Sequence, residues 1–152
     1  MRLLDQAKIP YVPHSYDPSI VDGVGVAAAL SQNPAATFKT LVTVSDKKRP
    51  YVFVIPVAMS LDLKKAARVV SVKSVSMLPQ KELLGLTGYI HGGCSPVGMK
   101  KKFPTVFHKT VLDFPSVCFS AGRVGFQVEV DPKTVLAYIA AETADIVVEE
   151  HD

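Results

Sequence analysis

The stretch FKTLVTVSDKKRPYVFVIPV, residues 38–57, contains two β-rich segments on either side of a polar turn. Residues 38–44 and 51–57 are dominated by β-branched, aromatic and other apolar side chains, which favour extended strands. The segment 45–50 between them is polar and ends in Pro50, as expected of a turn. The sequence therefore predicts a β-hairpin over residues 38–57.

Outside this hairpin, helical and extended patterns alternate along the chain. Helices are predicted over residues 1–8, 24–30, 61–69, 79–86 and 132–141. Further strands are predicted over residues 12–16, 89–91, 105–108, 117–120, 124–130 and 145–148. Because Pro13 has no backbone N–H to donate, we expect its strand at a sheet edge. Ser60 is expected to cap the helix that follows it.

These elements predict a mixed α/β fold class. We expect a mixed, mainly antiparallel or barrel-like sheet that is surrounded by the helices. The 152 residues are 48% hydrophobic and 20% charged, and they include no internal repeat and no low-complexity linker. We therefore expect one compact domain over residues 1–152 with a substantial hydrophobic core.

No segment of the sequence resembles a membrane span or a secretion signal. A span needs about 18 consecutive apolar residues, and Asp5 and Gln6 make the N-terminus polar too early for a signal peptide. The formal net charge of +3 is small for a nucleic-acid coat protein, but basic residues gather at 47–49, 64–65 and 100–102. We expect a cytoplasmic protein with no membrane partner.

The two cysteines, Cys94 and Cys118, form no recognisable metal or disulfide motif. They are far apart, without C-x-x-C spacing or a cluster of histidines nearby, so we expect reduced thiols and no metal. Cys118 stands in an apolar strand and is expected in the core. His14 and His108 are interpreted as surface or hydrogen-bonded strand residues rather than metal ligands.

The segment GGCSPVGMKKK, residues 92–102, is a glycine-rich loop that runs into three lysines. Glycines and a proline in a tight turn expose backbone N–H groups, and adjacent cations favour an anion. The loop therefore predicts a negatively charged ligand.

Two familiar phosphate-binding motifs fail at the residue that handles the phosphate. Gly93 and Gly98 have the spacing of a Walker A loop, but Met99 stands where lysine is required. A cysteine phosphatase that used Cys94 would need arginine at the position of Lys100, and lysine does not replace its bidentate fork. The sequence argues against both ATP hydrolysis and cysteine-based phosphate chemistry.

Lys39 and Cys94 each have a structural and a functional interpretation. Lys39 lies inside an apolar strand, on the face opposite Thr40, and is either a solvated edge lysine or a positioned cation; the pattern alone favours the former. Cys94 is either a reactive thiol or a small filler. We favour the filler, because only His91 stands nearby in sequence as a pairing base. Ser95 is interpreted chiefly as part of the turn before Pro96.

Short motifs along nearly the whole chain form a specific combination, although each is weak alone. They are His14-Ser15-Tyr16, Phe38-Lys39-Thr40-Leu41, Pro56-Val57, Leu61-Asp62-Leu63-Lys64-Lys65, Thr87-Gly88-Tyr89, Gly92-Gly93-Cys94-Ser95-Pro96-Val97-Gly98 and Lys100-Lys101-Lys102-Phe103-Pro104-Thr105. In this combination the chain resembles the YbaK/EbsC family of aminoacyl-tRNA deacylases. It is most similar to the Cys-tRNA(Pro) deacylase branch, which is related to the editing domain of bacterial prolyl-tRNA synthetase.

The resemblance implies an enzyme that hydrolyses cysteine from mischarged Cys-tRNA(Pro), or from Cys-tRNA(Cys), with prolyl-tRNA synthetase as a transient partner. Tyr16, Lys39 and the Gly92 backbone occupy the family's functional positions. The family's chemistry is substrate-assisted: the cysteinyl thiol attacks its own ester carbonyl and leaves as a thiolactone. Such a site needs no cofactor, no metal and no protein nucleophile.

The same resemblance places further residues at the substrate. Those expected to bind the aminoacyl group are Gly93, Cys94, Ser95, Pro96, Gly98 and Gln127, and those expected to contact tRNA phosphates are Lys100, Lys101 and Lys102. The chain departs from the family at two of them. Gln127 stands where the family often has an acidic residue, so recognition of the amino group is expected to differ. Cys94 replaces an aliphatic residue, which fits its interpretation as a filler.

Two other functions fit the same residues. One is a deacylase for another mischarged tRNA, such as Ala-tRNA(Pro), since pocket volume is not encoded in any motif. The other is a non-catalytic module that binds tRNA or a synthetase through its lysines, with little sequence readout. The intact Tyr16, Lys39 and Gly92 argue for the enzyme.

Overall fold

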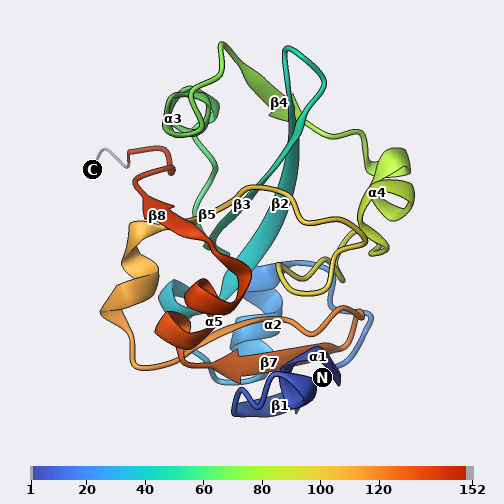
Figure 1. Ribbon diagram of the computed structural model, residues 1–152. Coiled ribbons are helices and arrows are strands. Elements are labelled where there is room, and N and C mark those ends of the chain that lie inside the picture. Colours follow the sequence, from blue (N-terminus) through green and yellow to red (C-terminus); the bar gives the residue numbers. More distant parts are fainter. Residues whose placement is uncertain (1, 150–152) are drawn as a thin grey trace.

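Two β-sheets organise the chain in the computed structural model, which describes residues 2–149 (Figure 1). The smaller sheet has the order β1-β7-β6, and the larger has the order β4-β2-β3-β5-β8. The strands are β1 (Tyr11–Ser15), β2 (Phe38–Ser45), β3 (Pro50–Pro56), β4 (Val75–Met77), β5 (Thr105–His108), β6 (Val117–Ser120), β7 (Phe126–Val130) and β8 (Glu142–Ala144). The α-helices are α1 (Arg2–Gln6), α2 (Gly23–Ala29), α3 (Leu63–Val69), α4 (Gln80–Thr87) and α5 (Pro132–Ile139).

The hairpin predicted over residues 38–57 is confirmed as the pair β2 and β3. The two strands are antiparallel, with register from Phe38 opposite Pro56 to Val44 opposite Pro50. Ser45 organises the turn, because its Oγ accepts the backbone N–H groups of Lys47 and Arg49, each at 3.2 Å. Both strands lie in the interior of the larger sheet, as the long pair in Figure 1 shows.

Both faces of β3 are buried, which explains why its sequence is apolar at every position rather than at alternate ones. Val52 and Val54 belong to the core between the two sheets. Phe53 and Ile55 point the other way, into a second core formed with α3 and the C-terminal segment. All four side chains have 0% exposure. The β2–β3 hairpin is therefore the layer shared by both cores.

The larger sheet is mixed, as predicted, but it is not the only sheet. β5 pairs parallel to β3, and β8 pairs parallel to β5, so long crossovers join these strands. The smaller sheet is antiparallel throughout, with β1 at its edge as Pro13 predicts. A parallel β-bridge between Thr37 and Cys118 links the two sheets near the start of β2.

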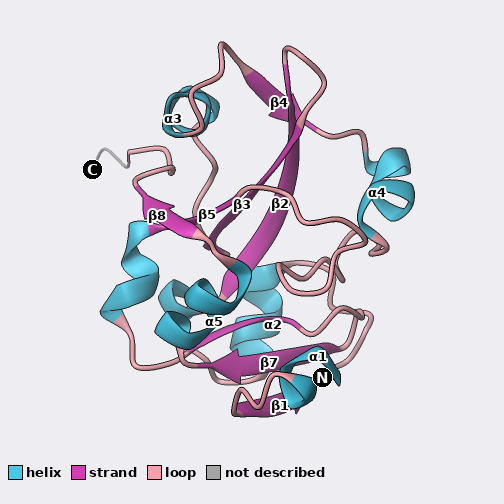
Figure 2. Cartoon of the chain, in the orientation of Figure 1, coloured by secondary structure: helices cyan, strands magenta, loops and turns pink. Residues whose placement is uncertain are grey.

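The strand predicted over residues 89–91 is wrong, because these residues form a loop. Gly88 ends α4 with φ 86°, and Tyr89 then donates its hydroxyl proton to the carbonyl oxygen of Val97. Residues 88–104 contain no helix or strand, and Figure 2 shows this connection as a continuous loop.

The structure differs from the sequence analysis at three other points. β4 was not predicted, because its three residues Val75–Met77 are too few for a strong pattern. The C-terminal strand lies at 142–144 rather than 145–148, since β5 pairs with that earlier segment and the apolar run after it packs into the second core. Asp62 caps α3 in place of Ser60 by accepting the N–H groups of Lys64 and Lys65. Among the described residues, no helix is long and apolar enough to cross a membrane.

Replacing the cap of α3 tests this assignment. Asp62→Ala is expected to lower the free energy of unfolding by about 1 kcal/mol, because two backbone N–H groups lose their acceptor. Ser60→Ala serves as the matched control and is expected to change it by less than about 0.5 kcal/mol. Urea unfolding followed by circular dichroism measures both; equal losses in the two variants would contradict the assignment.

Candidate active site

A cavity of about 460 Å³ opens where the glycine-rich loop meets the start of β2. Its walls come from the segment after β1, from α2, from α4, and from β6 and β7. Apolar side chains supply most of the wall: Ile20, Val21, Val24, Val26, Phe38, Leu41, Val57, Leu83 and Val124. A concave, mostly apolar cavity with a few polar groups is typical of a small-ligand site.

The three residues expected to act in catalysis all line this cavity. Tyr16 follows β1, and its backbone N–H donates to the carbonyl oxygen of Gly125 at 2.9 Å, which fixes the chain at that wall. Lys39 enters from β2, opposite Ile55 in the hairpin. Gly92 enters from the glycine-rich loop. The fold thus brings together residues that are separated by more than seventy positions in the sequence.

Lys39 is a partly buried cation without a carboxylate partner among residues 2–149. Burial lowers the pKa of its ammonium group, because a charged amine loses hydration inside the protein. Lys39 lies on an interior strand and is only partly exposed, so it is not the solvated edge lysine that the pattern alone favoured. An uncompensated cation at a cavity wall favours an anionic ligand or a developing negative charge.

The glycine-rich loop needs glycine for close approach to the β6–β7 turn. A Cβ at Gly93 would lie 3.1 Å from the backbone nitrogen of Val124, which is tighter than a side chain normally allows. Gly92 has φ 84°, a conformation that other residues rarely adopt. The Gly93 N–H donates to the carbonyl oxygen of Ile90 at 3.0 Å, whereas the Gly92 N–H has no partner within the described part of the chain. Gly92 is therefore one of the cavity-lining loop residues whose backbone N–H has no acceptor among the described residues.

Cys94 lines the cavity as a buried thiol. Burial raises its pKa to about 12, so the thiol remains protonated near neutral pH. This geometry supports the filler interpretation. Cys118, expected in the core, is also buried, with a pKa raised to about 12 by burial and by the charge of Glu129.

Gln127 lines the cavity from β7, and its side chain is held in place. Its Oε1 accepts a hydrogen bond from Nε2 of Gln32 at 2.8 Å, and only 5% of the residue is exposed. Gln127 is therefore a fixed neutral group at this wall of the cavity. A carboxylate does reach the cavity wall at Asp22, whose Oδ1 caps α2 by accepting the Gly25 N–H.

The other loop residues expected at the substrate lie outside the cavity lining. Ser95 is fully buried, and its Oγ accepts the Val97 N–H at 3.2 Å. Gly98 has φ 82° and packs against Leu3 and Tyr89. The residues absent from the lining are Gly93, Ser95, Pro96, Gly98, Lys100, Lys101 and Lys102. The first four shape the loop, and the three lysines are exposed beside it.

Thr40 is a cavity residue that sequence reasoning missed. Its Oγ1 is buried without a hydrogen-bond partner among the described residues. Strand alternation places Thr40 on the face opposite Lys39, yet the cavity wraps the start of β2 and contacts every residue from 37 to 41. The sequence signal that could have identified Thr40 is its position next to Lys39 at the start of a predicted strand. The hydroxyl is a buried polar group at the cavity wall, closed to solvent in this structure.

Comparison with known proteins identifies the family. Residues 17–138 match the model of the aminoacyl-tRNA editing domain. The chain belongs to this family. A protein of Enterococcus faecalis, named as a candidate Cys-tRNA(Pro)/Cys-tRNA(Cys) deacylase, EbsC, is 40% identical over an alignment of 152 positions that covers 99% of this chain and 93% of that protein. The editing-domain family thus accounts for nearly the whole sequence.

Solved structures extend the comparison to the fold. A structure described as a candidate trans-editing enzyme for prolyl-tRNA synthetase is 27% identical, with TM-score 0.84 over 96% of this chain and 92% of that one. The hypothetical protein APE2540 is 21% identical and has a TM-score of 0.89 over 97% of both chains. The second similarity concerns the fold alone. Both confirm the mixed α/β editing-domain architecture that the motifs predicted.

The environment of Lys39 predicts that this residue lowers stability. Below its depressed pKa, the folded protein carries the full cost of a poorly hydrated charge; this cost is relieved as pH rises toward 10.5, the value of an unperturbed lysine. Lys39→Met is therefore expected to raise Tm by about 1–3 °C at pH 7, with a smaller gain at pH 10.5. Differential scanning calorimetry with exposed Lys73→Met as control checks this; a lower Tm for Lys39→Met would contradict it.

The protonated Cys94 thiol gives a second prediction. Cys94→Ala is expected to retain at least about one third of the deacylation rate, because a thiol that keeps its proton supplies no nucleophile. The measurement is release of amino acid from aminoacyl-tRNA, with circular dichroism as the check on folding. Near-complete loss of activity in a folded variant would mean that the thiol takes part in the reaction.

Proposed function

We propose that this protein is an aminoacyl-tRNA deacylase whose main substrate is Cys-tRNA(Pro), with Cys-tRNA(Cys) as a further substrate. The observation that carries the proposal is one cavity lined by Tyr16, Lys39 and Gly92, beside the Cys94 thiol, whose raised pKa keeps it protonated. These groups bind and polarise an ester. None of the three is an activated nucleophile.

The size and polarity of the cavity suit the end of an aminoacyl-tRNA. About 460 Å³ accommodates a small amino acid together with part of the terminal ribose. The apolar wall, which includes Val26, Val57 and Leu83, favours a small and weakly polar side chain such as that of cysteine. The phosphate of the terminal nucleotide is attracted by Lys39 and by the lysines at 100–102 next to the loop.

The proposed reaction uses the substrate's own thiol. Its sulfur bonds to the ester carbonyl carbon, and the charge that develops on the carbonyl oxygen is stabilised by the Gly92 N–H and the Lys39 ammonium group. The bond to the ribose oxygen then breaks, and the thiol proton ends on that oxygen. A cyclic thiolactone leaves, and water opens it to cysteine. Tyr16 orients the ribose through its hydroxyl.

The relatives support this assignment. The name of the Enterococcus faecalis protein specifies Cys-tRNA(Pro) and Cys-tRNA(Cys), and its identity to this chain extends from end to end. The structural relative is described as acting for prolyl-tRNA synthetase. We propose the same synthetase as a transient partner that presents the tRNA in the cytoplasm. The modest net charge of +3 fits weak, salt-sensitive binding to tRNA alone.

The decisive experiment compares release of amino acid from Cys-tRNA(Pro) and Ala-tRNA(Pro) at one salt concentration. The wild type is expected to release cysteine faster than alanine. Lys39→Ala is expected to lower the rate of cysteine release by about 10²–10³, the typical cost of one oxyanion donor. Lys73→Ala, at an exposed position outside the cavity lining, is the matched control and should retain the wild-type rate.

A substrate with oxygen in place of sulfur separates the chemistry from the binding. Ser-tRNA(Pro) is expected to bind but to react slowly, because a hydroxyl is a weaker nucleophile than a thiol. Faster release of alanine than of cysteine would overturn the cysteine assignment. Binding of every tRNA with release of none would overturn the enzymatic function itself.

A further inference from the structure

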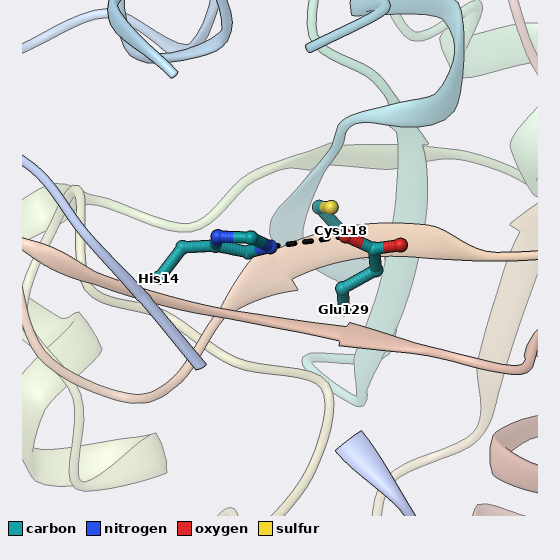
Figure 3. A group of neighbouring side chains, drawn as sticks. All are labelled: His14, Cys118 and Glu129. Carbon is teal, nitrogen blue, oxygen red and sulfur yellow. Dashed lines mark hydrogen bonds and ion pairs between the residues drawn. The ribbon is translucent and has the colours of Figure 1, made fainter. Parts of the chain in front are cut away.

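Three side chains that are distant in the sequence converge on one face of the smaller sheet (Figure 3). Each comes from a different strand: His14 from β1, Cys118 from β6 and Glu129 from β7. Cys118 lies directly opposite Glu129 on the neighbouring strand. His14 lies opposite Gln127, which is two residues before Glu129 on β7 and therefore on the same face of the sheet. The imidazole nitrogen, the sulfur and the carboxylate oxygen all lie within 4.8 Å of one another.

We propose that His14, Cys118 and Glu129 bind a single divalent metal ion of the Zn²⁺ type. Imidazole, thiolate and carboxylate are all zinc ligands, and a set of three with one open position is a known zinc arrangement. The sulfur disfavours Mg²⁺ and Ca²⁺, which prefer oxygen ligands. A thiolate and a carboxylate also balance the two positive charges, so the occupied site is neutral and suited to a partly buried position.

The ligand atoms are already oriented for this role. Nε2 of His14 lies 3.0 Å from Oε1 of Glu129, its hydrogen-bond partner, so the two atoms are close enough to bind one ion that replaces the shared proton. Ser116 donates its hydroxyl proton to Oε2 of Glu129 at 2.7 Å, which holds the carboxylate in place and leaves Oε1 for the metal. The side chains of His14 and Glu129 are 28% and 34% exposed, which leaves an open side for entry and for a water ligand.

Metal binding at this site requires a defined movement of protons. Without metal, Cys118 keeps its proton, since burial and the charge of Glu129 raise its pKa to about 12. The metal displaces that proton to solvent when the metal–sulfur bond forms. The imidazole proton moves from Nε2 to Nδ1, so that Nε2 becomes the ligand. No electron is transferred, and no further reactant is needed.

The proposed site lies next to the cavity without being part of it. Ser120 and Gln127 are the next paired residues on the same face of β6 and β7, and both line the cavity. A metal bound by His14, Cys118 and Glu129 would tie the three strands together behind that wall. The proposed role of the metal is therefore structural: it would hold β1, β6 and β7 together next to the cavity wall. The inference does not rest on the proposed deacylase function.

Cobalt binding tests the proposal directly. The protein, free of any histidine tag, is stripped with EDTA, cleared of the chelator and titrated with Co²⁺. The expected result is one ion per chain and a thiolate-to-cobalt charge-transfer band in the near ultraviolet, which Zn²⁺ then abolishes by displacement. Cys94→Ala is the matched control, because it removes the other buried thiol, and it should keep the band.

Variants at Cys118 complete the test. Cys118→Ala should lose the band and bind Zn²⁺ about 100-fold or more weakly, since loss of a direct ligand costs at least as much as loss of an outer contact. Cys118→Ser, which nearly preserves volume, gives the same readout if the alanine variant fails to fold. No band in the folded wild type, or a band that persists without Cys118 or disappears without Cys94, would overturn the proposal.

Discussion

The burial of β3 on both faces is the constraint on which the rest of the structure depends. Its side chains alternate between the core shared by the two sheets and the core beneath α3, so both cores depend on the position of this one strand. A strand buried in this way must lie inside a sheet and not at its edge. β2 and β5 therefore flank it, and the start of β2 is held where the two sheets meet. That position is where Lys39 enters the cavity.

The cavity is formed mainly where several loops meet, and no single sheet encloses it. Its walls are the chain after β1, the glycine-rich loop and the β6–β7 region, and backbone contacts join them. The Tyr16 N–H bonds to Gly125, and Gly93 lies against the backbone of Val124. Such direct backbone packing leaves little freedom for the walls to move separately. The connections that carry Tyr16 and Gly92, two of the proposed catalytic residues, are thus joined through the chain between β6 and β7.

Local patterns were sufficient for the hairpin, for the edge position of β1 and for the grouping of Tyr16, Lys39 and Gly92 through their family motifs. They failed where tertiary contacts decide the outcome. The segment 89–91 has a strand-like composition but follows the path imposed by Gly88 and by the Tyr89 hydroxyl bond to Val97. The meeting of His14, Cys118 and Glu129 depends on strand register across more than 100 residues, which no spacing rule encodes.

The protonated state of Cys94 has a consequence for the lifetime of the enzyme under the proposed function. A protein thiolate beside an activated cysteinyl ester would compete with the substrate and become acylated, leaving the amino acid attached to the enzyme as a thioester. Desolvation keeps Cys94 in its unreactive form. The apolar surroundings of Cys94 thus allow a cysteine in the wall of a site that binds a cysteinyl ester. Because the thiol stays protonated, the substrate does not acylate and inactivate the enzyme.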